Sequence, residues 1–216
     1  MTTIKRVLGI IGTILFMILF LLFNNVYNQD TFRNFMLIQA IAGTILILLV
    51  FNPSTKRVKY AFLAGCATAI STFILGAYGT FVGWYLFLGG RIQILGVPLE
   101  MIIWVFFIGA ASSVISEAPK ILRKTSSLFR RFFDKIEHVE KLFGPILIFG
   151  ISAYGTLLDF FSIQFGALEL APYWSFAFSY CIWLAISFIT LITYNYLKMP
   201  YEFEKLNADE DLKTEL

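Results

Sequence analysis

Long apolar runs alternate with short polar gaps along this chain, and six of the runs are long enough to cross a bilayer. A hydrocarbon core of ~30 Å requires about 20 residues of helix. The runs cover roughly residues 7–23, 35–51, 60–82, 98–116, 143–161 and 173–197. Backbone amides in lipid are satisfied only in helices or closed barrels, and these runs lack the alternation of barrel strands. The sequence therefore predicts an all-α fold, a polytopic membrane bundle of six transmembrane helices.

The positive charges occupy only every second gap between these runs. Of the 17 Lys and Arg residues, only Arg33 and Arg91 lie in the other gaps. Because cytoplasmic loops carry the excess of Lys and Arg, this distribution predicts a multi-pass protein of the cell membrane with both termini in the cytoplasm. The first run has an alternative interpretation as a signal peptide. Residues 23–27 offer no small-residue cleavage site, so we expect a retained helix.

The domain organisation follows from length and composition. With 216 residues, 58% of them hydrophobic, the chain predicts one membrane domain over residues 1–200 and an acidic cytoplasmic tail over residues 201–216. Residues 126–143 have an apolar stripe opposite basic residues, which predicts an amphipathic helix on the membrane surface or packed on the protein itself. We expect membrane lipid as a partner and no nucleic acid, because the positive charges follow the topology and form no cluster.

A short motif occurs twice, at the outer end of the third and fifth runs. Residues Ala77-Tyr78-Gly79-Thr80 recur as Ala153-Tyr154-Gly155-Thr156. Duplication of a helical hairpin is one explanation, and membrane proteins often place binding sites between such repeats. Chance is the other, since small residues recur at helix contacts. The sequence leaves both open.

Three acidic residues lie near or within the predicted spans. A charge at the bilayer centre costs at least ~2.5–3.5 kcal/mol, and the cost falls towards the interface. Glu117 lies at a cytoplasmic end, where we expect it to pair with a nearby cation. Glu100 and Asp159 lie at equivalent outer depth, so they are candidates to face one cavity and serve as catalytic acids. The alternative is that Glu100 caps its helix and Asp159 is hydrated at the interface.

The aromatic residues also allow two interpretations. Most are explained by the belts that Trp and Tyr form at membrane interfaces. Alternatively, the tryptophans line a slot for a long apolar or polyene ligand, and their ring faces stabilise a carbocation. His138 is the only histidine and has no cysteine near it, so we expect no His or Cys metal site and no cofactor.

One segment resembles a known family. Gly83-Trp84-Tyr85-Leu86-Phe87, then Ile94-Leu95-Gly96-Val97-Pro98-Leu99-Glu100, then Trp104-Val105-Phe106-Phe107 resemble the membrane-embedded lycopene cyclases, which have Gly-x-Trp and then Gly-x-Pro-x-Glu-Glu before an aromatic helix. Related carotenoid hydratases have a similar Gly-x-Pro element. Met101 stands where the family has its second acid. The resemblance implies that Glu100 protonates the end of a polyene.

Two classes of function follow. The first is a lipid-phase isoprenoid- or carotenoid-modifying enzyme, an isomerase-like protein that performs acid-initiated cyclisation or hydration. Its expected site has Glu100 and Asp159 as catalytic acids and four substrate-binding residues, Trp84, Pro98, Trp104 and Trp174. The second class is a non-enzymatic protein, either a small transporter or a subunit of a membrane complex, with homo-oligomers also possible.

Overall fold

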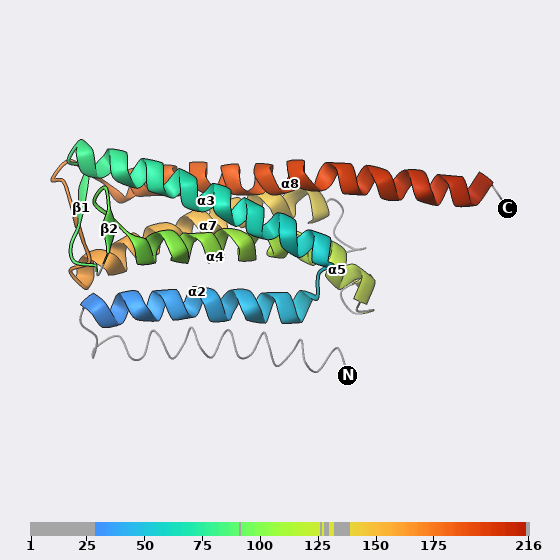
Figure 1. The fold of residues 1–216 in the computed structure, drawn as a ribbon, viewed down its shortest axis with the longest axis horizontal. Helices are drawn as coiled ribbons and strands as arrows, with labels where there is room; N and C mark the ends of the chain where they lie inside the picture. The colour runs from blue at the N-terminus through green and yellow to red at the C-terminus, as the bar shows by residue number, and fades with distance from the viewer. Residues whose placement is uncertain (1–28, 91, 126, 128–129, 132–138, 215–216) are drawn as a thin grey trace.

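Long helices dominate the structure and lie side by side along one axis (Figure 1). The computed structural model describes residues 29–90, 92–125, 127, 130–131 and 139–214. The elements, in chain order, are α2 (Gln29–Phe51), α3 (Thr55–Phe81), β1 (Tyr85–Phe87), β2 (Gln93–Ile94), β3 (Val97–Pro98), α4 (Leu99–Ile115), α5 (Ala118–Thr125), α7 (Val139–Gln164), β4 (Leu168–Leu170) and α8 (Phe176–Thr214). The prediction of a helical protein is thus confirmed.

Four of these helices are long and apolar enough to cross a membrane. The segments are Phe32–Phe51, Thr55–Phe81, Leu142–Gln164 and Phe176–Pro200. Helix α4 is also apolar but has only 17 residues, or about 26 Å at 1.5 Å per residue. The protein is therefore a membrane-embedded helical protein. The expected first span, residues 7–23, and most of the expected amphipathic helix, residues 126–143, lie outside the described residues.

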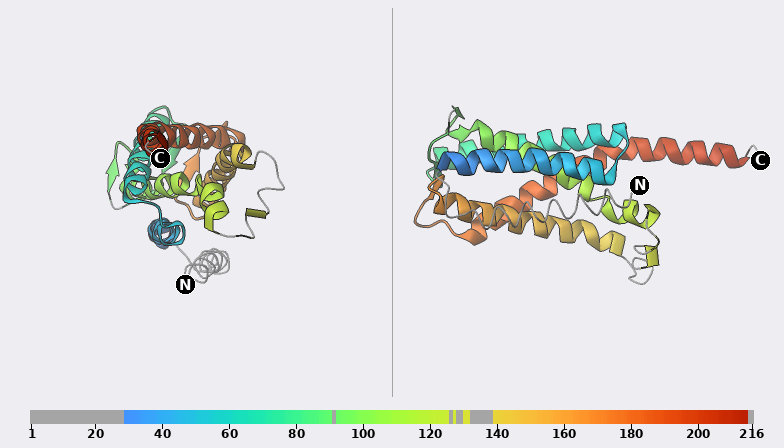
Figure 2. Two further views of the ribbon diagram at one scale, coloured as in Figure 1. Left: turned by 90° about the vertical axis from the view of Figure 1, so that its right-hand side faces the viewer. Right: turned by 90° about the horizontal axis from the view of Figure 1, so that it is seen from below.

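Successive long helices run in opposite directions, so the connections gather at two ends. The short strands lie at one end, and the α2–α3 connection, α5 and the C-terminal half of α8 lie at the other (Figures 1 and 2). The described basic residues divide in the same way. Arg33 lies near the start of α2, at the strand end, while Arg57 and Lys198 lie at the opposite end. Which side of the membrane each end faces stays a prediction.

Helix α4 lies at the centre of the bundle and packs on α2, α3 and α8 (Figure 2). The approach of α3 to α4 is close because the buried face of α3 consists of Ala, Gly and Thr residues. A Cβ atom built on Gly65 would lie only 2.5 Å from the carbonyl oxygen of Phe106 on α4. Across the next interface, the Thr68 and Thr190 hydroxyl oxygens lie 2.7 Å apart and join α3 to α8.

We expect Gly65→Ala to lower the stability of the bundle by about 1–3 kcal/mol, because the added methyl group forces two backbones apart. Gly144→Ala is the matched control. Its Cβ atom meets no heavy atom within 4 Å, so the better helix propensity of alanine acts alone. Thermal unfolding in detergent should show a lower melting temperature for Gly65→Ala only. Equal melting temperatures would contradict the close approach of α3 and α4.

Two small antiparallel sheets form in the connections at the strand end, where the sequence predicted only loops. Strand β1 pairs with β4, and β2 pairs with β3. The β2–β3 hairpin closes through Leu95 and Gly96, which both have positive φ, 51° and 81°, as a tight two-residue turn requires. The β1–β4 pair joins the α3–α4 hairpin to the α7–α8 hairpin, with Leu86 opposite Glu169. The all-α prediction therefore holds for the membrane helices but not for these connections.

The C-terminal acidic segment continues helix α8 as far as Thr214, beyond the end of the bundle (Figure 1). The sequence analysis treats residues 201–216 as a separate tail. Residues 201–214 contain Glu, Lys, Leu and Ala, which are strong helix formers, and Pro200 does not end the helix. The tail is thus a helical extension of the last span.

Candidate functional site

The two acids that the sequence singled out reach the same pocket from different helices. Glu100 lies in the first turn of α4, two residues after Pro98, whose extended backbone (φ −62°, ψ 133°) precedes the helix. A carboxylate at that position is favoured by the helix dipole. Asp159 lies near the end of α7, next to the buried Leu158. Both acids line one pocket near the strand end of the bundle.

The pocket has mainly apolar walls and draws residues from the helices α2, α4, α7 and α8 and from the strands β1, β3 and β4. Its lining residues are Phe32, Arg33, Met36, Phe87, Pro98, Glu100, Met101, Trp104, Leu158, Asp159, Ser162, Ala167, Leu168 and Trp183. The empty space between them is about 610 Å³, including the part open to the surroundings. Of the six expected site residues, four therefore lie around one space: Pro98, Glu100, Trp104 and Asp159.

Asp159 is oriented by a tryptophan on the neighbouring helix. Trp183 of α8 donates a hydrogen bond from Nε1 to Asp159 Oδ2 at 2.9 Å. The Trp183 ring reaches this position because it lies over Gly155, one turn before Asp159, where any Cβ atom would collide with the ring. The glycine of the repeated motif is thus required for the aspartate contact. In the first copy, Gly79 accommodates the Tyr85 ring in the same way.

The second tryptophan of the pocket is Trp104, and it packs edge-to-face on Trp183. The ring centroids lie 6.0 Å apart with an interplanar angle of 84°. Trp104 is 6% exposed, and its Nε1 atom is buried without a hydrogen-bond partner among the described residues. A buried indole N–H of this kind is a donor for a bound molecule or for water.

The other two expected tryptophans lie further away. Trp174 lines an adjacent cavity, which shares Asp159 and Trp183 with the first. Trp84 lines neither cavity but packs on Trp174 with ring centroids 5.6 Å apart. The four tryptophans therefore form two pairs, and no single slot contains them all among the described cavities. Trp174 also donates from Nε1 to Ser179 Oγ at 2.8 Å.

Tyr85 stands between these cavities and the end of α3. Its hydroxyl group donates a hydrogen bond to the carbonyl oxygen of Leu75 at 2.8 Å. Burial raises the pKa of Tyr85 far above its usual range, and the negative charge of Asp159 raises it further. The hydroxyl group is therefore a hydrogen-bond donor at any physiological pH.

Arg33 is a charged pocket residue that was not among the predicted site residues. It lies in α2, and its Nη2 atom donates to the carbonyl oxygen of Ala167 at 3.3 Å. The pocket therefore contains one permanent positive charge with the two acids. A signal was present in the sequence, since Arg33 and Arg91 are the two basic residues that break the alternation of charge along the chain.

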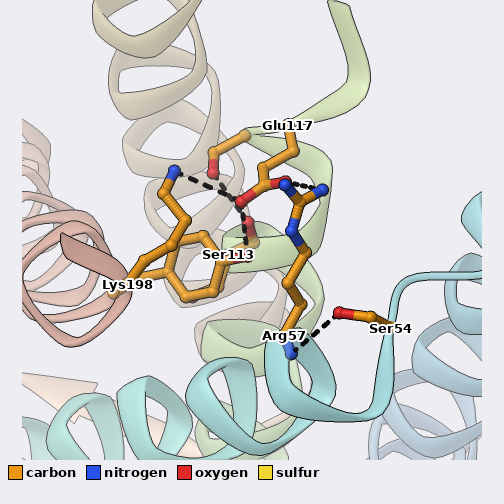
Figure 3. Close-up of polar contacts among 7 residues, drawn as sticks. Ser54, Arg57, Ser113, Glu117 and Lys198 are labelled. Atoms are coloured by element: carbon orange, nitrogen blue, oxygen red, sulfur yellow. Dashed lines mark hydrogen bonds and ion pairs between the residues drawn. The ribbon is translucent and has the colours of Figure 1, made fainter. Parts of the chain in front are cut away.

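Glu117 forms a separate cluster at the opposite end of the bundle, shown in Figure 3. Its carboxylate lies 2.7 Å from Arg57 Nη1 and 3.2 Å from Lys198 Nζ, and Tyr194 donates a hydrogen bond to it at 2.8 Å. The expected pairing with a cation is confirmed. The residue is not at an exposed interface, however, because only 3% of it is accessible. The cluster joins α3, the α4–α5 connection and α8.

Comparisons of the chain with protein-family models, with curated proteins and with solved structures found no match. The resemblance to lycopene cyclases therefore stays a prediction from the motif residues.

Proposed function

We propose that the protein is an integral membrane enzyme that protonates one end of a long apolar, isoprenoid-like substrate such as a carotenoid. The observation that carries this proposal is the meeting of Glu100 and Asp159, from α4 and α7, in one pocket with Trp104 and Trp183. A carboxyl group placed against a bound substrate can act as a general acid. Aromatic ring faces stabilise a passing cation.

In the proposed reaction, the Glu100 carboxyl group transfers its proton to a terminal carbon–carbon double bond. The electron pair of that double bond forms the new C–H bond, which leaves a carbocation on the neighbouring carbon. Attack by a second double bond, followed by return of a proton to the carboxylate, gives a ring. Attack by water, followed by loss of a proton, gives an alcohol. Asp159, oriented by Trp183, stabilises the cation, and the reaction needs no cofactor.

For the topology, we propose six spans with both termini in the cytoplasm. This is supported by the described basic residues of α3, α5 and α8, which lie at the end of the bundle away from the strands. The acid pocket then lies in the outer half of the membrane, close to the β1–β4 pair. A substrate would reach it from the lipid phase.

The test is expression in cells that accumulate lycopene, followed by extraction and chromatography of the pigments. We expect cyclic or hydrated carotenoid with the unmodified chain and none with the double variant Glu100→Gln/Asp159→Asn. Both substitutions preserve side-chain shape and remove the carboxyl groups. An unmodified chain that is present in the membrane and leaves lycopene unchanged would contradict the proposal and favour the non-enzymatic class, a small transporter or complex subunit.

A further inference from the structure

We propose that an apolar groove between α2, α4 and α7 binds the hydrocarbon chain of a lipid substrate and leads its end to the acid pocket. This inference rests on the proposed function and adds the path by which the substrate enters. The groove is lined by Gly43 of α2, Ile108 and Ala111 of α4, and Leu147 and Gly150 of α7. Its empty space is about 920 Å³, counted out to its open side.

The groove and the acid pocket are stacked along the same three helices. On each helix, a groove residue lies four positions from a pocket residue: Ala40 and Met36 on α2, Ile108 and Trp104 on α4, Tyr154 and Leu158 on α7. Residues four apart lie above one another on one face of a helix. The two spaces are therefore consecutive levels of one path that runs parallel to the helix axes.

A single polar contact marks the boundary between the two levels. Tyr154 of α7 donates to Gln39 Oε1 of α2 at 3.5 Å, which is the long limit for a hydrogen bond. The backbone of α7 lies on α8 and well away from those of α2 and α4. Tyr154 also packs against the buried cluster that contains Met36, Ala40 and Leu158, so a ligand that passes this level must displace side chains but no helix backbone.

Two glycines widen the groove. Glycine in a helix interior destabilises the fold by roughly 0.5–1 kcal/mol relative to alanine. At Gly65 a close helix contact explains the residue, but a Cβ atom on Gly43 or Gly150 would meet no heavy atom within 4 Å. No packing among the described residues accounts for either glycine. Both widen the groove instead.

The surface of the groove selects an apolar occupant. Thr44 and Ser112 line it, but Thr44 Oγ1 bonds to the carbonyl oxygen of Ala40 at 2.7 Å and Ser112 Oγ to that of Ile108 at 2.7 Å. The hydroxyl protons are thus engaged by main-chain carbonyls, and Thr44 Oγ1 also lies 3.0 Å from the carbonyl oxygen of Phe107 on α4. A hydrocarbon chain needs no polar partner along its length, and the polar residues Gln39 and Tyr154 lie at the level where its reactive end would pass.

The experiment uses geranylgeraniol with a diazirine at its hydrocarbon end as the probe, added to the full chain in lipid nanodiscs. After illumination, mass spectrometry locates the labelled residues. We expect labels on α2, α4 and α7 around the groove, and about a tenfold loss of labelling with Gly150→Leu, which fills it. Gly144→Leu is the matched control, since Gly144 is in the same helix, has the same open space and does not line the groove.

Three results would overturn the inference. The first is labelling that Gly150→Leu leaves unchanged. The second is nonspecific labelling that is spread over the lipid-facing helices. Excess unlabelled geranylgeraniol does not reduce such labelling, and this competition test needs only the unmodified chain, so it still applies if Gly150→Leu does not fold. The third is disulfide formation between Gly150→Cys and single cysteines placed along residues 7–23, which would show that the chain itself fills the groove.

Labelling requires no turnover, so the proposal that the groove binds a lipid and the proposal that the protein is an enzyme can be rejected independently. If the groove is labelled but lycopene stays unchanged, the lipid-binding site is supported and the proposed reaction is rejected. If Gly150→Leu converts lycopene as well as the unmodified chain does, the reaction is supported and the groove is rejected as the path of the substrate.

Discussion

Replacing Glu100 alone by glutamine is expected to reduce carotenoid product by about 100-fold or more, the usual contribution of a general acid. Glutamine has almost the same shape and retains a hydrogen-bonding group, but it has no acidic proton to give to the substrate. Product would be quantified by chromatography from lycopene-accumulating cells and normalised to the amount of protein in the membrane. Glu169→Gln is the matched control, because Glu169 is an exposed acid on β4 outside the pocket.

Variants of Asp159 and Trp183 distinguish the roles of the two acids. Asp159→Asn is expected to have a smaller effect, because it removes the negative charge near the cation, and Trp183→Phe a still smaller one, because it removes only the hydrogen bond that orients Asp159. Trp183→Phe should cost little more in the Asp159→Asn background, since the orienting bond then has no charge to place. Full activity of Glu100→Gln would contradict its role as donor. A greater loss with Asp159→Asn than with Glu100→Gln would exchange the roles of the two acids.

Replacing Glu117 by alanine is expected to lower the free energy of unfolding by about 3–5 kcal/mol, the usual effect of breaking a buried ion pair. The change leaves Lys198, whose side chain is 9% exposed, without its carboxylate, and the Tyr194 hydroxyl group loses its acceptor. Arg57 is less affected because 29% of its side chain is exposed and water replaces the carboxylate. Chemical unfolding in mixed micelles, followed by tryptophan fluorescence, measures the change.

The double variant Glu117→Leu/Lys198→Met provides the control for this cluster. It removes both buried charges together, so it should destabilise the protein much less than Glu117→Ala does. If Glu117→Ala alone changed the unfolding free energy by less than about 1 kcal/mol, the value typical of surface pairs, the cluster would have no structural role.

The helices were the predictable part of this fold. Hydropathy and length locate them because the lipid requirement acts on each segment separately. The β1–β4 pair was not predictable, since it joins segments about eighty residues apart through main-chain hydrogen bonds and has no side-chain signature. Helix α4 is shorter than expected because Pro98 pairs in β3, and Ser116 ends the helix at the other side.

The candidate site was predictable in its acids and less so in their surroundings. Glu100 and Asp159 stand out because charges are rare in spans, and the shared pocket agrees with the depth argument. The choice of Trp84 depended on the Gly-x-Trp motif and on the predicted tryptophan slot, and the structure locates this residue outside both acid-lined cavities. The contact of Trp183 with Asp159 depends on helix packing over Gly155, which a single sequence does not reveal.

The Glu117 cluster also bears on the order of events during synthesis. Arg57 of α3 and Glu117, which directly follows α4, belong to one helical hairpin, whereas Lys198 follows some eighty residues later. The hairpin can thus pair its acid with arginine before α8 is made. Lys198 and Tyr194 of α8 then bind the same carboxylate, which fixes the position of α8 along the hairpin.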